Sequence, residues 1–385
     1  MIYFDFAATT PLDSEAAEVY VKVATDYFGN TQSLHDQGGQ AQAILENCRE
    51  ELAHLLGIDQ RGLYFTSGGS EGNFLAIEAL LSSPLKTGKH IIAGMAEHSS
   101  IHGVLNRLKK DGYKITLLPF DSNGLIDIEL LKKSIRPETV LISLQHVNSE
   151  IGTIQPIEEI AAIAKQNSIH FHSDFVQSFG KINVKTVAPL VSSFSFSGHK
   201  IYGPKGIGAV YLNPTIAWRA FFPGGSHENG LRPGTLNVPA IAAMTAAAQK
   251  IAGRLDEDHV KFSKLRQTFI ETLEPIKESV KIYQAVEGRQ LYNIIGMRIT
   301  GIEGQWMMLE CNRQGFAIST GSACQIGMQT PAKVTEALAL AKDEAKEFIR
   351  ISFGQSSSLE EVRSLGETVV NIVNSFKTAA ITRKK

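Results

Sequence analysis

Lys200 is the first residue whose surroundings suggest chemistry. It ends the segment Ser197-Gly198-His199-Lys200, which directly follows an apolar run at 191–196 and precedes a stretch rich in glycine and proline. A lysine that is fixed in a loop and partly buried loses its proton more easily, and the free amine can then attack a carbonyl group. Taken alone, a lysine in such a loop is more often a surface residue of a hairpin.

Other polar side chains also follow short apolar runs. Gly69 and Ser70 lie in a Gly/Ser turn that opens into a helix, where backbone N–H groups and the helix dipole favour a phosphate. His98 can cover a planar ring and transfer protons, whereas a metal site with His102 is not expected because no third ligand is evident nearby. Asp174 can pair with the protonated nitrogen of a pyridine ring.

The three cysteines differ in their surroundings. Cys48 lies on the apolar face of a predicted helix, and Cys311 lies in a helix-like segment, so both are expected to be structural. Cys324 follows the small residues Ser319-Thr320-Gly321-Ser322-Ala323 and has no periodic apolar neighbours. An exposed thiol in such a segment can form a thiolate nucleophile.

The elements that must position these residues alternate between strands and helices. This alternation predicts an α/β fold in which helices wrap a mostly parallel, seven-stranded sheet. The last two strands are separated by a Gly/Pro-rich stretch and should form a hairpin with one antiparallel strand. In such sheets ligands bind beyond the carboxyl ends of the strands. The strand-like runs are 63–66, 90–95, 114–118, 140–147, 169–173, 191–196 and 207–212.

The pattern changes after about residue 250. Shorter elements there predict a smaller α+β domain that also takes the first residues of the chain. We expect a large domain at 15–250 and a small domain formed by 1–14 and 251–385, with Cys324 in the small domain. Its predicted elements are an amphipathic stretch at 252–279, strands at 292–300, 316–320 and 348–353, and helices at 303–313 and 359–376.

Composition and charge are those of an ordinary globular protein. The 385 residues are 43% hydrophobic and 20% charged, with a formal net charge of -1. The chain has no excess of basic residues that would favour binding to nucleic acid or to an anionic membrane. The first residues do not resemble a secretion leader, and no apolar run reaches the length of about eighteen residues that spans a bilayer. We therefore expect a cytoplasmic protein that binds neither nucleic acid nor a membrane.

Over nearly its whole length the chain resembles the cysteine desulfurases of the class V, fold-type-I family of pyridoxal-phosphate (PLP) enzymes. The resemblance implies the PLP-dependent transferase fold, with a large seven-stranded domain and a smaller α+β domain, as a homodimer with its sites at the interface. The matching segments are Asp5 to Pro11, Gly29-Asn30 with Ser33 and His35, His146 to Gly152, Ser197 to Gly206, and Arg232 with Gly234-Thr235.

The resemblance also implies a role for each candidate residue. Lys200 would carry PLP and act in catalysis with His98 and Cys324. Thr235 would reach the phosphate from the partner subunit, and no metal is implied. The other cofactor contacts implied are Gly69, Ser70, His98, Asn148, Asp174, Gln177, Ser197 and His199, and the implied substrate contacts are Asn30, Asn148 and Arg350.

The implied reaction converts L-cysteine to L-alanine and leaves the sulfur on Cys324 as a persulfide. The acceptor protein would be an iron–sulfur scaffold, a tRNA-thiolation enzyme or a dedicated client. Two enzyme alternatives share the cofactor, a class V aminotransferase and a selenocysteine lyase. Cys324 argues against the aminotransferase, and selenocysteine preference stays open. A non-catalytic sulfur carrier would not need Lys200, Asp174 and Gln177 together.

Overall fold

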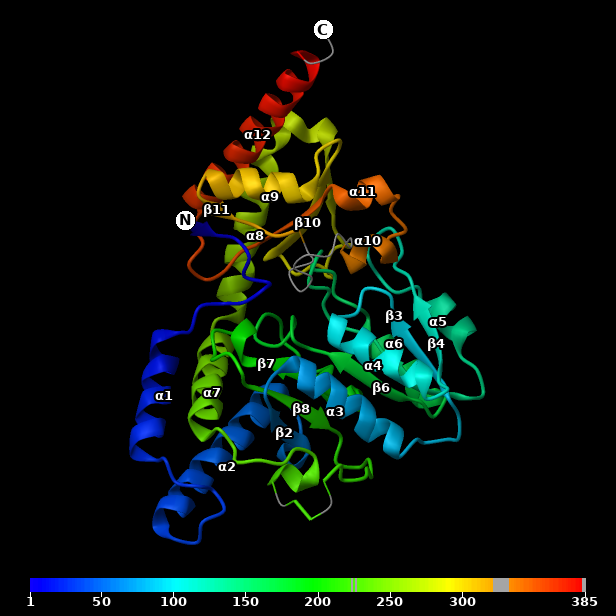
Figure 1. Ribbon diagram of the computed structural model, residues 1–385, viewed down its shortest axis with the longest axis vertical. Coiled ribbons are helices and arrows are strands. Elements are labelled where there is room, and N and C mark those ends of the chain that lie inside the picture. Colours follow the sequence, from blue (N-terminus) through cyan, green and yellow to red (C-terminus); the bar gives the residue numbers. More distant parts are fainter. Residues whose placement is uncertain (223, 226, 321–331, 383–385) are drawn as a thin grey trace.

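A computed structural model describes residues 1–222, 224–225, 227–320 and 332–382, so Cys324 lies outside the described residues. Figure 1 shows a larger lobe built around a sheet and a smaller lobe that carries both ends of the chain. The smaller lobe lies beyond the large sheet along the long axis of the molecule. Within the described ranges, no helix is long and apolar enough to cross a membrane.

The large lobe contains a seven-stranded sheet in the order β2-β8-β7-β6-β5-β3-β4. The neighbours from β4 to β7 are parallel, and β8 is antiparallel to both β7 and β2. The mostly parallel sheet and its closing hairpin are therefore confirmed. The strands are β2 (Leu63–Thr66), β3 (His90–Gly94), β4 (Lys114–Leu118), β5 (Thr139–Ser143), β6 (His170–Asp174), β7 (Ser193–Ser197) and β8 (Gly208–Leu212).

Helices cover both faces of this sheet because successive side chains of a strand point to opposite faces. Ile91 packs with apolar residues of α3 and α4, whereas Ile92 packs in a separate core with residues of α2, α6 and α7. Cys48 lies in that second core and is only 5% exposed, as the apolar stripe of its helix predicted. The helices are α1 (Ser14–Asp26), α2 (Asp36–Leu56), α3 (Gly69–Ser82), α4 (Ser99–Lys110), α5 (Ile128–Ser134), α6 (Ile157–Gln166) and α7 (Val238–Ala252).

The small lobe has a core of its own. Phe4 packs there with Phe269, Met297, Ile351 and Val369, all of which are fully buried. A three-stranded antiparallel sheet, β12-β10-β9, and a parallel pair, β1-β11, support this core. Its elements are β1 (Ile2–Tyr3), α8 (Leu255–Thr272), β9 (Val280–Tyr283), β10 (Ile294–Ile299), α9 (Gly304–Arg313), β11 (Phe316–Ala317), α10 (Lys333–Ala337), α11 (Lys342–Lys346), β12 (Phe348–Ser352) and α12 (Leu359–Thr382).

Some boundaries differ from the prediction. The strand predicted at 140–147 is β5 at 139–143, although the backbone N–H groups of Leu144 and His146 still donate to the carbonyls of His172 and Asp174 in β6, at 3.1 and 3.0 Å. The strand expected at 316–320 pairs only over 316–317, and α12 continues to 382 instead of ending at 376. Strand β9 was not predicted.

An ion pair ties α2 to the edge of the large sheet. Arg49 lies 2.8 Å from Glu228, whose side chain is only 1% exposed. The other carboxylate oxygen of Glu228 accepts a hydrogen bond from the backbone N–H of Phe65 at 2.6 Å. Arg49 also donates to the carbonyl of Leu63 and pairs with Glu46, which is 49% exposed. Glu228 therefore pairs with the Arg49 side chain of α2 and also accepts a hydrogen bond from the backbone of β2.

We expect Glu228→Gln to lower the free energy of unfolding by about 3 kcal/mol, because a buried pair that loses one charge leaves the other uncompensated. Glu46→Gln removes a carboxylate from the same arginine at an exposed position and should cost no more than about 1 kcal/mol. Urea unfolding of the two variants checks this prediction. Equal effects of the two substitutions would show that burial of Glu228 contributes nothing.

Candidate active site

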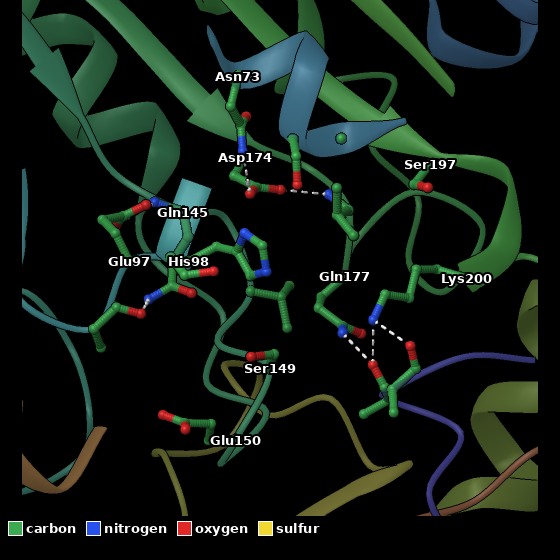
Figure 2. A pocket seen from close by; sticks show the side chains of 18 of the residues that line it. Asn73, Glu97, His98, Gln145, Ser149, Glu150, Asp174, Gln177, Ser197 and Lys200 are labelled. Atoms are coloured by element: carbon green, nitrogen blue, oxygen red, sulfur yellow. Dashed lines mark hydrogen bonds between the residues drawn. The ribbon is translucent and has the colours of Figure 1, made fainter. Parts of the chain in front are cut away.

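A cavity of about 350 Å³ lies beyond the carboxyl ends of β3, β6 and β7 (Figure 2). Strand-end loops of the large lobe and the start of α3 form most of its wall, and the N-terminal segment, Lys333 of α10 and Arg350 of β12 supply the remainder. The cavity brings together most of the residues that the sequence predicted. Those that line it are Gly69, Ser70, His98, Asp174, Gln177, Ser197, His199, Lys200 and Arg350.

The N-terminal segment holds Lys200 at the cavity. Lys200 ends a short 3-10 turn after β7, and its amine donates to the carbonyl oxygens of Ala7 at 2.6 Å and Ala8 at 2.8 Å. The same segment binds the backbone of this turn, because the N–H and hydroxyl of Thr10 both donate to the carbonyl of His199, at 2.9 and 3.0 Å. The segment at Asp5–Pro11 therefore holds the Lys200 amine through the main-chain carbonyls of Ala7 and Ala8, which residue types do not reveal.

Gly198 allows this turn to form. A Cβ at Gly198 would lie 2.9 Å from a methyl group of Ile207 and 3.0 Å from the carbonyl oxygen of Pro204. Both contacts are closer than real Cβ atoms normally allow, and the second is with backbone that cannot easily move. The small residue before His199 and Lys200 is therefore a steric requirement of the loop.

Asp174 is fixed by its neighbours at the end of β6. One carboxylate oxygen accepts from the side-chain amide of Asn73 at 2.8 Å, and the other accepts from the backbone N–H of Val176 at 2.9 Å. Asn73 is in turn bonded to Ser195 and lies 3.0 Å from the ring nitrogen of His172. Figure 2 shows Asn73 above Asp174 at one end of the cavity. The prediction missed Asn73, although it is a polar residue on a buried helix.

Gln177 lies beside the predicted cofactor lysine. Its side-chain nitrogen donates to the carbonyl oxygen of Ala7 at 2.9 Å, the same oxygen that accepts from Lys200. Figure 2 shows the two side chains extending side by side toward this acceptor. The amide nitrogen of Gln177 is therefore close to the amine of Lys200. A contact between Gln177 and the ring oxygen of a cofactor held by Lys200 would require this proximity.

The start of α3 is suited to an anion. The residue before the helix, Gly68, provides no side-chain cap. A second hollow, lined by 67–71 with Ser197 and His199, lies beside these backbone groups. The backbone N–H groups of the first helical turn and the helix dipole favour a phosphate there.

His199 lines both hollows and is held by the hydroxyl of Thr9 at 3.1 Å. Burial, followed by the positive charges of Lys200, Lys205, Lys181 and His98, lowers the pKa of His199 to about 4. The ring is therefore neutral at physiological pH. A neutral imidazole can still donate one hydrogen bond to a phosphate.

His98 forms the wall opposite Lys200 in Figure 2. It caps the N-terminus of α4, because its Nδ1 accepts from the backbone N–H of Ser100 at 3.2 Å. Nδ1 also lies 2.8 Å from the hydroxyl of Ser100. These contacts fix the orientation of the ring.

Arg350 brings the small lobe into the site. It projects from β12, is 3% exposed, and pairs with Asp5 at 2.6 Å while donating to the carbonyl of Ser149 at 3.0 Å. Its Nε is buried and has no hydrogen-bond partner among the described residues. A guanidinium with a remaining donor can take a carboxylate.

Glu150 was not predicted as a site residue and also lines the cavity. Its carboxylate accepts from the backbone N–H of Val334 at 2.8 Å, shortly after the segment that contains Cys324. Burial raises the pKa of Glu150 to about 7, although the Val334 N–H and the charges of Arg350, Lys333 and His98 oppose this shift. A carboxyl group of this kind titrates near physiological pH.

Three predicted residues do not line the cavity. Asn148 is buried, and its side-chain oxygen accepts from the N–H groups of Glu150 and Ile151, both at 2.9 Å, so it shapes the turn beside the cavity. Asn30 and Thr235 are exposed and lie away from the cavity of their own chain. The contacts expected of them stay predictions, as does the role of Cys324.

The residues of the cavity fit PLP. An amine, a carboxylate held by two hydrogen bonds, an amide donor and an uncapped helix start surround one space. These groups match the aldehyde, ring nitrogen, phenolic oxygen and phosphate of that cofactor. The match concerns the types of groups that meet in the cavity.

Comparison with known proteins identifies relatives along almost the entire chain. The putative cysteine desulfurase NifS of Bacillus subtilis (strain 168) is 45% identical over 369 residues, which cover 96% of this chain and 93% of the relative. The cysteine desulfurase IscS of Dictyoglomus turgidum is 35% identical over 377 residues. The aligned region covers 98% of this chain and 95% of the relative. A solved NifS-like protein has a TM-score of 0.87 at 30% identity, covering 97% of this chain and 99% of its own.

The aminotransferase class-V family matches residues 2–365, nearly the whole sequence. The similarity therefore includes both lobes and the segment of Cys324. It agrees with the fold and with the cavity between the lobes. The chain belongs to the class-V aminotransferase family.

Proposed function

We propose that this protein is a PLP-dependent cysteine desulfurase that removes the sulfur of L-cysteine and releases L-alanine. The observation that carries the proposal is the meeting of Lys200, Asp174 and the uncapped start of α3 in one cavity. The names of the relatives support the substrate, since both curated relatives described above are called cysteine desulfurases.

Bound PLP supplies an electron sink that stabilises negative charge at the substrate Cα. Lys200 would hold the cofactor and later move the proton at the substrate Cα. Asp174, fixed by Asn73 and the Val176 N–H, would keep the ring nitrogen protonated. The start of α3 and the neutral His199 would bind the phosphate.

Arg350 would orient the substrate by binding its carboxylate. The thiolate of Cys324 would then attack the substrate sulfur, so that an S–S bond forms while the C–S bond breaks. The electron pair of the broken bond stays with the substrate carbon, which takes up a proton to give alanine. His98, which faces Lys200 across the cavity, would act as acid or base.

The other two cysteines are poor nucleophiles. Cys48 is 5% exposed and Cys311 is fully buried. Burial raises the pKa of the Cys48 thiol, and burial with the charge of Glu310 raises the pKa of Cys311 to about 12. Both thiols therefore stay protonated at physiological pH, which favours Cys324 as the sulfur acceptor.

The proposal extends to the assembly and its partners. A homodimer would bring Thr235, and with it Asn30, to the cavity of the other subunit. The persulfide on Cys324 would pass to a sulfur-acceptor protein in the cytoplasm. The large domain would comprise 15–250, and the small domain would comprise 1–14 with 251–385.

We expect Lys200→Ala to abolish the visible absorbance of bound PLP while far-UV circular dichroism is unchanged, because the amine that carries the cofactor is lost. Lys185→Ala removes an exposed lysine of the same lobe and should leave the absorbance intact. Borohydride reduction followed by mass spectrometry checks which lysine is modified. A reducible cofactor adduct that persists in Lys200→Ala would assign the cofactor to another lysine.

Cys324→Ser should separate the two halves of the reaction. The variant should bind PLP and change its spectrum when cysteine is added, yet release sulfide at least about a thousandfold more slowly, because the nucleophile is missing. Cys48→Ala should keep normal sulfide release. Mass spectrometry of the unsubstituted protein after one turnover should find the extra sulfur on Cys324, and finding it on Cys48 or Cys311 would refute the assignment.

A further inference from the structure

Lys181 is a basic residue beside the cavity to which no role has been assigned. It lies four residues after Gln177, in an irregular turn in which the N–H of Lys181 donates to the carbonyl of Ser178 at 3.0 Å. Gly180, which precedes Lys181, has a φ of 71° in this turn. The amine of Lys181 donates to the side-chain oxygen of Gln177.

The two ends of the Gln177 amide therefore have different partners. Its nitrogen faces the carbonyl of Ala7, which can only accept a hydrogen bond, and its oxygen faces the amine of Lys181. An amine has N–H donors in both of its protonation states. Rotating the amide by half a turn would place oxygen against oxygen at Ala7, so the observed orientation is the one that satisfies both contacts.

Charge balance does not explain the position of Lys181. Lys181 forms no ion pair with any described carboxylate, although its side chain is partly buried. Burial, followed by the charges of Lys200 and Arg350, lowers its pKa well below the usual value. A lysine in such surroundings is costly unless it makes a useful contact. Among the residues that the structure describes, its amine has a hydrogen bond with Gln177.

We propose that Lys181 is a positioning residue that acts through Gln177 and keeps the amide nitrogen of Gln177 directed at the phenolic oxygen of the cofactor. The proposal rests on the proposed function, because it assumes that Lys200 carries PLP. In PLP the aldehyde and the phenolic oxygen are on adjacent ring carbons. The amide nitrogen of Gln177 and the amine of Lys200 both donate to the Ala7 oxygen. The amide nitrogen therefore lies on the side of the lysine where the phenolic oxygen of the cofactor would be.

This role predicts a spectroscopic effect with a definite sign. A donor to the phenolic oxygen stabilises its negative charge most strongly after the cofactor-bound Lys200 nitrogen has lost its proton. Weakening the hydrogen bond from Gln177 to the phenolic oxygen therefore disfavours loss of the proton from the cofactor-bound Lys200 nitrogen. The pH midpoint of the visible absorbance should rise when Lys181 can no longer hold the amide.

The test compares holoenzymes in a pH titration of the visible absorbance, together with the dissociation constant of PLP. Lys181→Met keeps the length of the side chain and removes its N–H groups, so the midpoint should rise by about one pH unit. Cofactor affinity should weaken by up to about tenfold, as for the loss of one buried hydrogen bond. Lys181→Arg should restore most of both values, and the exposed control Lys185→Met should change neither.

A Gln177→Leu background separates this role from a structural one. If Lys181 acts through Gln177, Lys181→Met should add no further shift in that background, because the coupled residues are not additive. A shift of the same size in both backgrounds would overturn the inference, as would an unchanged midpoint in Lys181→Met. A protein that never forms a lysine-bound cofactor would instead contradict the proposed function itself.

Discussion

The carbonyl oxygen of Ala7 accepts hydrogen bonds from Lys200 and Gln177, and the arrangement of the site depends on the segment that supplies it. Residues 5–10 run between the lobes: Asp5 pairs with Arg350 of β12, and Thr10 binds the backbone of the Lys200 turn. The preceding residues pair with β11. One short strap therefore sets the position of the lysine relative to the arginine.

The charges around the cavity explain why an anionic ligand fits it. Lys181, Lys200 and Arg350 are close enough that the charges of the other two lower the pKa of Lys181. Asp5 and Asp174 are opposite charges, but Asp174 is already held by two neutral donors. Buried cations are costly, and a bound phosphate and a substrate carboxylate would offset that cost. This cluster of charged groups marks the cavity as a functional site.

Much of this site follows from residue types at strand ends. Lys200, Asp174, His98 and the turn before α3 could be predicted because each comes directly after an apolar run of strand length. The contacts of Ala7 could not be predicted, since they are made by the main chain.

The remaining features depend on contacts that the local sequence does not contain. Asn73 supports Asp174 across 101 positions of sequence. Lys181 acts within an irregular turn, where no regular pattern indicates an i, i+4 pair. Asn30 and Thr235 lie outside the cavity of their own chain, so their roles at the site stay predictions. Strand β9 was missed because it is only four residues long and just one of them is buried.

The most direct test of the account is the product of a single turnover with L-cysteine in the absence of a reductant. The purified PLP-loaded protein is mixed with cysteine labelled in carbon and sulfur, and both labels are followed. The account predicts one alanine and one protein-bound sulfur per active site. Pyruvate and ammonia, or transfer of the amino group to form a keto acid, would contradict it.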